Sequence, residues 1–88
     1  MSNAVLDAVE KGTTDEARAV GLKVLRNLSA SETNQVPMFN TPRLVSVVLG
    51  ALGSQDELKK EGLAVFLNLA QTESNRARLV ANPKILPG

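Results

Sequence analysis

The sequence predicts an all-α fold of the solenoid type, and two observations support this prediction. First, the chain repeats itself: residues 13–45 align without gaps on residues 54–86, and ten of these 33 aligned positions are identical. Second, each copy spaces its apolar residues as helices do, and no segment shows strand alternation between hairpin turns. A period of about 40 residues with helical patterning is typical of α-solenoids, whose units bury apolar faces against their neighbours.

The identical positions are spread along the whole repeat rather than gathered in one motif. Most other pairs keep their chemistry, as Leu25 and Phe66 or Met38 and Leu79 do. The identical pairs are Asp15/Asp56, Glu16/Glu57, Gly21/Gly62, Leu22/Leu63, Val24/Val65, Asn27/Asn68, Leu28/Leu69, Glu32/Glu73, Asn34/Asn75 and Pro42/Pro83.

The composition allows one small globular domain and argues against several functions. The 88 residues are 43% apolar and 22% charged, with two Phe and no Trp or Tyr, so the core consists of Leu, Val, Ala and Ile. The chain has no Cys and no His, which removes disulfides and the commonest metal ligands, nucleophiles and general bases. We therefore expect no enzyme activity, no cofactor, no metal and no small-molecule substrate.

Charge and hydropathy argue against two further classes of partner. The net charge is +1, and basic and acidic residues are spread along the chain, which argues against nucleic acid. No apolar run reaches the roughly 18–20 residues that span a bilayer, and no signal peptide is evident, which argues against a membrane. These features predict a cytoplasmic protein, with the nucleus as the other compartment. Residues 1–4 resemble a tag remnant or an N-terminal tail.

The first predicted helices are a short segment and a long one. The short segment, Ala4–Glu10, matches a later helix if the loop after it carries two extra residues, which aligns Leu6 with Leu49 and Val9 with Leu52. The long helix runs from about Thr14 to Ala30. Its apolar stripe at helical spacing consists of Ala17, Gly21, Val24, Leu25 and Leu28.

The second copy of the long helix, from about Gln55 to Gln71, places its apolar residues at the same positions. They are Leu58, Gly62, Val65, Phe66 and Leu69. Both long helices begin with the pattern of a capping box, in which a hydroxyl and a Glu three residues later satisfy backbone amides of the first turn. The two boxes are Thr13 with Glu16 and Ser54 with Glu57.

A short helix and a third helix follow each long one. Asn34 and Asn75 are the expected N-caps of the short helices, with Met38-Phe39 and Leu79-Val80 as buried contacts. Thr41-Pro42 and Asn82-Pro83 then begin the third helices, because proline at the first helical position needs no amide hydrogen. The first of these third helices covers about Arg43–Leu52.

This three-helix order, with Asn-Leu near the end of the long helix, resembles the armadillo repeat. The residues that carry the resemblance are Gly21-Leu22-x-Val24-Leu25-x-Asn27-Leu28-Ser29 and Gly62-Leu63-x-Val65-Phe66-x-Asn68-Leu69-Ala70. The resemblance covers residues 5–86 and implies an armadillo-type solenoid fragment, which is a right-handed α-α superhelix. It divides into a partial repeat at 5–30, a complete repeat at 34–71 and the start of a further repeat at 75–86.

The resemblance also implies a function, which is binding a protein or an extended peptide in a concave groove lined by the long helices. Asn27 and Asn68 occupy the position at which armadillo proteins hydrogen-bond the peptide backbone, a task that suits an amide with a donor and an acceptor. Four further candidates lie one and two turns earlier on that face, and members that hold nuclear-localisation peptides carry Trp at the first pair. These candidates are Lys23, Ala64, Val20 and Glu61.

Two alternatives stay open at this point. The chain is also interpretable as a structural repeat fragment that associates with itself or packs on neighbouring repeats, because its ends show Val5, Leu6, Ile85 and Leu86. A weaker alternative is a lipid or nucleic-acid surface contact through Arg76, Arg78 and Lys84. Three charges are few beside the roughly 6–10 phosphates that nucleic-acid-binding proteins typically neutralise.

Overall fold

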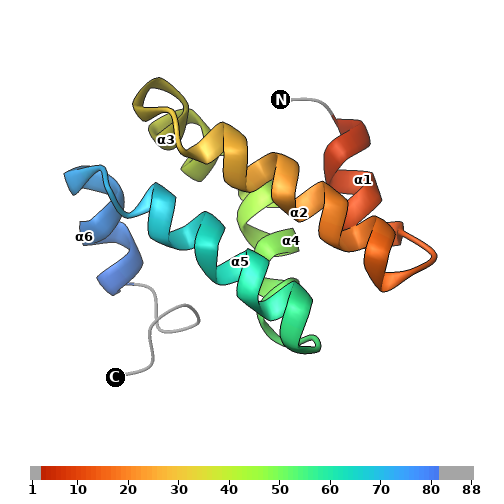
Figure 1. Cartoon of the computed structure of the whole chain (residues 1–88). Helices are drawn as coiled ribbons and strands as arrows, with labels where there is room; N and C mark the ends of the chain where they lie inside the picture. The colour runs from red at the N-terminus through yellow and green to blue at the C-terminus, as the bar shows by residue number, and fades with distance from the viewer. Residues whose placement is uncertain (1–2, 82–88) are drawn as a thin grey trace.

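The computed structural model describes residues 3–81, and these residues form six helices and no strand. The all-α prediction is therefore confirmed for the described part of the chain. No helix within it is long and apolar enough to cross a membrane. In chain order the helices are α1 (Asn3–Lys11), α2 (Asp15–Ser29), α3 (Glu32–Phe39), α4 (Pro42–Leu52), α5 (Asp56–Leu69) and α6 (Glu73–Ala81) (Figure 1).

The two long helices α2 and α5 lie side by side and run in the same direction, and theirs is the most extensive helix contact in the protein (Figure 1). Helix α1 packs against α2, and α4 packs against α5 in the corresponding way. Helices α3 and α6 follow the ends of the long helices. The arrangement is thus two successive units of short, long and short helices, α1–α2–α3 and α4–α5–α6.

Two glycines mark the point where each long helix crosses the short helix before it. An added Cβ at Gly21 would lie 3.3 Å from the Val9 nitrogen and 3.4 Å from the Val5 carbonyl oxygen. An added Cβ at Gly62 would lie 3.3 Å from a methyl of Leu52 and 3.5 Å from the Val48 carbonyl oxygen. The contacts correspond if two residues are inserted in the loop after α1, so the predicted pairing of Val9 with Leu52 is confirmed.

The predicted apolar stripe is confirmed on α5 and is wrong in part on α2. Leu58, Gly62, Val65, Phe66 and Leu69 are all buried. On α2 the buried residues are Ala19, Gly21, Leu22, Leu25 and Ser29, whereas the predicted Ala17, Val24 and Leu28 are exposed. The reason is tertiary: α5 has α2 on one side, and within the described residues α2 has no long helix on the corresponding side.

Both predicted capping boxes are wrong by one residue. The N-cap of α2 is Thr14, whose hydroxyl accepts a hydrogen bond from the Ala17 amide at 3.1 Å. The N-cap of α5 is Gln55, which makes no side-chain cap bond, while the Ser54 hydroxyl donates to the Gly50 carbonyl at 3.3 Å. Adjacent hydroxyl residues in Thr13-Thr14 make either position plausible by sequence, and backbone geometry selects the second.

Asn34 and Asn75 are not N-caps, because they are the third residues of α3 and α6. Their side-chain amides instead donate to carbonyls that end the preceding long helices, Asn34 to Leu28 at 3.0 Å and Asn75 to Leu69 at 3.0 Å. The last carbonyls of a helix lack intrahelical partners, so an amide placed just after the turn satisfies one of them. The repeated asparagine therefore closes a long helix rather than opening a short one.

The predicted contacts of the short helices are confirmed with one exception. Met38, Phe39 and Leu79 are buried, but Val80 is 71% exposed. Pro42 begins α4 after Thr41, as predicted. The predictions for Asn82-Pro83, Lys84, Ile85 and Leu86 lie outside the described residues.

The two short helices α1 and α4 are joined by charges at the surface. The Arg43 guanidinium donates to the carboxylates of Asp7 and Glu10, the latter at 3.2 Å. The Arg43 hydrogen bond lowers the pKa of Asp7 below its ordinary value, and the two carboxylates raise the pKa of Arg43. These exposed pairs orient α1 on α4 and contribute little to the free energy of unfolding.

The glycine crossings predict opposite outcomes for the same substitution. An alanine gains about 1 kcal/mol of helix propensity over glycine, and overpacking costs about 1–3 kcal/mol. An added Cβ at Gly21 would lie 2.6 Å from a stiff methyl of Val9, whereas the nearest atom at Gly62 is the flexible end of Leu52. We expect Gly21→Ala to lower the free energy of unfolding by about 1 kcal/mol or more, and Gly62→Ala to leave it unchanged or raise it.

Urea unfolding followed by circular dichroism measures both variants against the wild-type chain. Each variant serves as the control for the other, because the two share the residue change, the helix position and the repeat position. Equal shifts for the two variants would contradict the unequal tightness of the two crossings.

Candidate partner-binding surface

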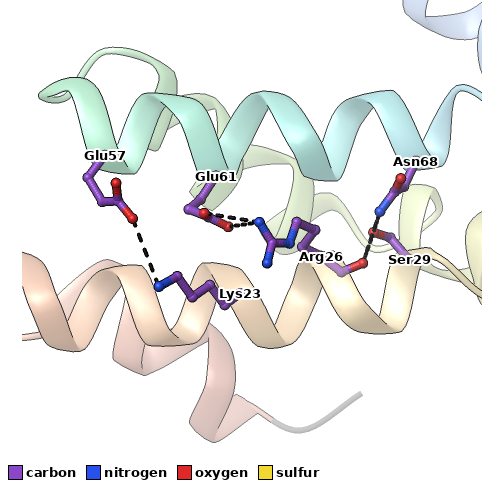
Figure 2. Close-up of polar contacts among 6 residues, drawn as sticks. All are labelled: Lys23, Arg26, Ser29, Glu57, Glu61 and Asn68. Atoms are coloured by element: carbon purple, nitrogen blue, oxygen red, sulfur yellow. Dashed lines mark hydrogen bonds and ion pairs between the residues drawn. The ribbon is translucent and has the colours of Figure 1, made fainter.

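A row of polar contacts joins α2 to α5, and we call it the seam (Figure 2). Lys23 Nζ lies 3.9 Å from Glu57 Oε1, and Arg26 Nη1 lies 2.9 Å from Glu61 Oε2 and 3.1 Å from Glu61 Oε1. At the far end, the Asn68 side chain bonds to the last turn of α2. The seam thus contains Lys23, Glu61 and Asn68 from the set that the resemblance implied for peptide binding.

Glu61 is the most deeply placed member of the seam. It is 3% exposed, and its carboxylate is held by Arg26, whose side chain is 40% exposed. A buried carboxylate is stable in the folded protein only while it keeps its partner, because burial of an unpaired charge is costly. Glu61 is therefore placed beneath the surface, between the two long helices, and not on an open groove.

The Asn68 side chain uses its amide nitrogen, but not its oxygen, in hydrogen bonds within residues 3–81. Its Nδ2 donates to the Arg26 carbonyl at 3.0 Å and to Ser29 Oγ at 3.1 Å, and Ser29 Oγ donates to the Arg26 carbonyl at 2.8 Å. Both amide hydrogens therefore satisfy the end of α2. The remaining atom, Oδ1, has no hydrogen-bond partner within residues 3–81 and keeps its capacity to accept.

Asn27 occupies the same repeat position and has a different environment. It is exposed, and its side chain makes no hydrogen bond within the described part of the chain. Val20, two turns earlier on α2, is 60% exposed. Both are open for the same reason, because their counterparts Asn68 and Glu61 face α2, and the described residues place no long helix against this side of α2.

Lys23 and Ala64 are the remaining predicted site residues, and they too lie on the adjacent long helices. Lys23 is half exposed, and its 3.9 Å contact with the exposed Glu57 is a surface ion pair of little energetic weight. Ala64 is half-buried. The structure thus brings the accessible atoms of Val20, Lys23 and Asn27 onto α2, with Ala64 and Asn68 on α5 beside them.

Sequence reasoning missed a buried glutamine that joins the ends of the two units. Gln35 is 1% exposed; its Nε2 donates to the Ser29 carbonyl at 3.0 Å and to Gln71 Oε1 at 3.1 Å, and its Oε1 accepts from Thr72 at 2.6 Å. Asn75 donates to the Gln35 carbonyl at 2.9 Å. Gln35 aligns with Arg76, so repeat identity gave no signal for it.

Within residues 3–81, no group of three or more His, Cys, Asp or Glu side chains is arranged to hold a metal ion. The seam carboxylates have other tasks, since Glu61 pairs with Arg26 and Glu57 stands in the first turn of α5. The groups that this surface exposes are amide, ammonium and aliphatic ones.

The Arg26–Glu61 pair predicts a double-variant recovery. Arg26→Leu leaves Glu61 buried without a partner, and we expect it to lower the free energy of unfolding by about 2 kcal/mol. This is less than the roughly 3–5 kcal/mol expected for a fully buried pair, because the Arg26 side chain is partly exposed to solvent. Arg26→Leu/Glu61→Val should return to within about 1 kcal/mol of wild type, since apolar replacements of buried ion pairs are often neutral.

Chemical unfolding at low protein concentration gives the free energies for this cycle. Lys23→Ala is the matched control, because it removes an exposed seam pair and should change stability by less than about 1 kcal/mol. A double variant as unstable as Arg26→Leu alone would show that the charge on Glu61 is not what makes the single variant unstable.

Family models, curated proteins and solved structures were each compared with the chain, and none of the three comparisons found a match.

Proposed function

We propose that this chain is a protein-interaction module of the armadillo type that binds an extended peptide along α2 and α5. The single observation that carries the proposal is the pair of asparagines at one repeat position. Within residues 3–81, Asn27 has an unpaired, exposed amide, and Asn68 on the next long helix has an unpaired Oδ1. Adjacent parallel helices thereby present amide groups at a regular repeat, which suits a ligand with regularly spaced peptide units.

The chemistry of such a row fits a peptide backbone better than a particular side chain. A primary amide both donates and accepts, so Asn27 can pair the carbonyl and the N–H of an extended ligand. Asn68 contributes only as an acceptor, because its two hydrogens bond α2. The ligand therefore gains its contacts from its main chain, as in other modes of extended-peptide recognition.

Charge and apolar surface around the asparagines add a modest preference. Lys23 is held only by a long ion pair with Glu57, so an acidic ligand side chain can compete for it. Val20 and Ala64 supply small aliphatic contacts at the margin of the row. We propose an extended segment with an acidic residue near Lys23 as the preferred ligand class.

The superhelical geometry is part of the same proposal. The crossing of α1 on α2 recurs as the crossing of α4 on α5, with a glycine at each contact. A recurrent crossing with parallel long helices supports a solenoid in which the long helices line one face. The peptide row lies on those long helices.

Selection of binders from a random display library of extended peptides tests the proposal, because every ligand sequence competes in one experiment. For a selected peptide, Asn27→Ala should weaken the affinity by about 1–2 kcal/mol, roughly tenfold, because it removes one or two hydrogen bonds. Titration calorimetry or fluorescence anisotropy with the synthetic peptide measures the change.

Ser46→Ala is the control, since Ser46 is an exposed hydroxyl on α4, away from the long helices that carry the row. Asn27→Asp adds a finer test, because it keeps an acceptor, loses the donor and should disfavour acidic peptides. Selected peptides that bind Asn27→Ala and the wild-type chain equally, or a library from which nothing is enriched, would overturn the proposal.

A further inference from the structure

The two outer sides of the protein carry apolar residues at several repeat positions that are buried elsewhere in the same chain. On α2, Val24 and Leu28 are each 37% exposed, while their counterparts Val65 and Leu69 are fully buried. On α5, Leu63 is 46% exposed and its counterpart Leu22 is fully buried. Each unit therefore exposes one face to solvent, and the equivalent face of the other unit is covered in the contact between the two units.

We name these two faces by their order along the chain. The leading face belongs to the first unit and consists of Ala17, Val20, Val24, Leu28 and Pro37. The trailing face belongs to the second unit and consists of Lys60, Leu63, Ala64, Leu67 and Val80. Residues of the trailing face line a shallow hollow on the outer side of α5 together with Asp56 and Lys59.

The contact between the two units shows how a trailing face holds a leading face. In this inner junction α2 and α3 present the trailing positions of the first unit, and α5 and α6 present the leading positions of the second. Apolar burial, the seam and the Gln35 contacts hold it together. The same positions recur, unpaired within the described residues, on the two outer faces.

Residues that pair in the inner junction have counterparts of different chemistry on the outer faces, and both members of a pair differ together. Arg26 and the buried Glu61 form the ion pair inside, and their counterparts outside are Leu67, 71% exposed, and Val20, 60% exposed. A charged pair has become an apolar pair on both faces at once. A solvent-facing helix position favours polar residues, so exposure alone does not account for either change.

A second pair of positions shows the same joint change. Inside, the Arg78 guanidinium lies 4.6 Å from the centre of the Phe39 ring. The counterpart of Phe39 on the trailing face is Val80, 71% exposed, and the counterpart of Arg78 on the leading face is the exposed Pro37. A cation–aromatic pair has again become an apolar pair, on different helices from the first.

The hydrogen bonds of the inner junction also have counterparts. Asn68 donates to the Arg26 carbonyl inside, and Asn27 stands ready to donate in the same way to the Leu67 carbonyl of a trailing face. Exposed Glu16 takes the place of Glu57, opposite Ala64 rather than Lys23. No counterpart pair brings two like charges together at these positions.

From these matched faces we propose that a second copy of this chain docks head-to-tail, with its leading face on the trailing face of the first. Leu67 then packs on Val20 of the next copy, and Val80 packs on Pro37. The second copy is the occupant because both halves of the match are carried by one chain, and the inner junction already shows their geometry. The contact is heterologous, so it repeats from copy to copy.

This contact shares Val20 and the Asn27 amide hydrogens with the peptide row, so stacking and peptide binding compete for α2. In the stack the Asn27 amide hydrogens bond the preceding copy as those of Asn68 bond α2, and Asn27 Oδ1 stays unpaired as Asn68 Oδ1 does. Leu67 and Val80 belong to the trailing face alone and have no part in the peptide row. A chain held monomeric at Leu67 therefore still tests peptide binding by itself.

Paired charge variants at Leu67 and Val20 test the proposal. Sedimentation velocity and light scattering from micromolar to millimolar concentration should show a mass for the wild-type chain that rises without a fixed limit. Leu67→Arg alone and Val20→Glu alone should each weaken association by roughly tenfold or more, because each buries an unpaired charge. Leu67→Arg/Val20→Glu should associate again, since its two faces repeat the Arg26–Glu61 chemistry.

Leu67→Arg/Val20→Arg is the matched control, with two substitutions and no complementary pair, and it should remain monomeric. A mixture of the two single variants should regain association. Circular dichroism checks that each variant folds. We expect every variant to fold, because the substituted positions are exposed. A wild-type chain that stays monomeric at millimolar concentration overturns the proposal. So does a double variant that stays monomeric while wild type associates, because a two-fold contact would bring like residues together and gain nothing from opposite charges.

Discussion

The parallel packing of α2 on α5 is the contact on which the rest of this structure depends. A chain of this length with two aromatic residues has little volume to bury within either unit, so the core is shared between them. Leu22 and Leu25 from α2 meet Leu58, Val65 and Leu69 from α5 in that shared core. Helices α1 and α4 then pack on α2 and α5 at the glycine crossings. Without the contact between the long helices, neither unit has a complete core.

Apolar packing brings the long helices together, and polar contacts set their register. Leucine and valine surfaces tolerate a slip along the helix axis, whereas the Arg26–Glu61 pair and the Asn68 bonds to the end of α2 hold only at one register. Gln35 does the same for the short helices, because its bonds to Gln71 and Thr72 join α3 to the turn that follows α5. Buried polar groups of this kind lose more when mispaired than apolar groups do.

The sequence predicted the helices and their order along the chain. Its predictions failed for residues whose burial or hydrogen bonding depends on a neighbouring helix. Periodicity gave the buried face of α5 correctly, because α5 has a long helix beside it. The same rule misplaced Val24 and Leu28, because spacing along a helix does not reveal which side is covered. Asn34 and Asn75 were assigned to the wrong helix end, since an amide satisfies donors or acceptors equally well. Asn27 and Asn68 share a residue type and a position, and only the fold shows that one is free and the other half engaged.

The ion pair between α2 and α5 also bears on how the chain avoids misassembly as it folds. Tandem units of similar sequence invite mispairing, in which the first unit of one molecule packs on the first unit of another. Here the α2 surface that carries Arg26 packs poorly on the α2 surface of another molecule. Val20 stands there at the repeat position of Glu61 and gives the Arg26 guanidinium no acceptor. A second unit supplies Glu61 at that position. The ion pair thus distinguishes a second unit from another first unit, although the two units are similar in sequence.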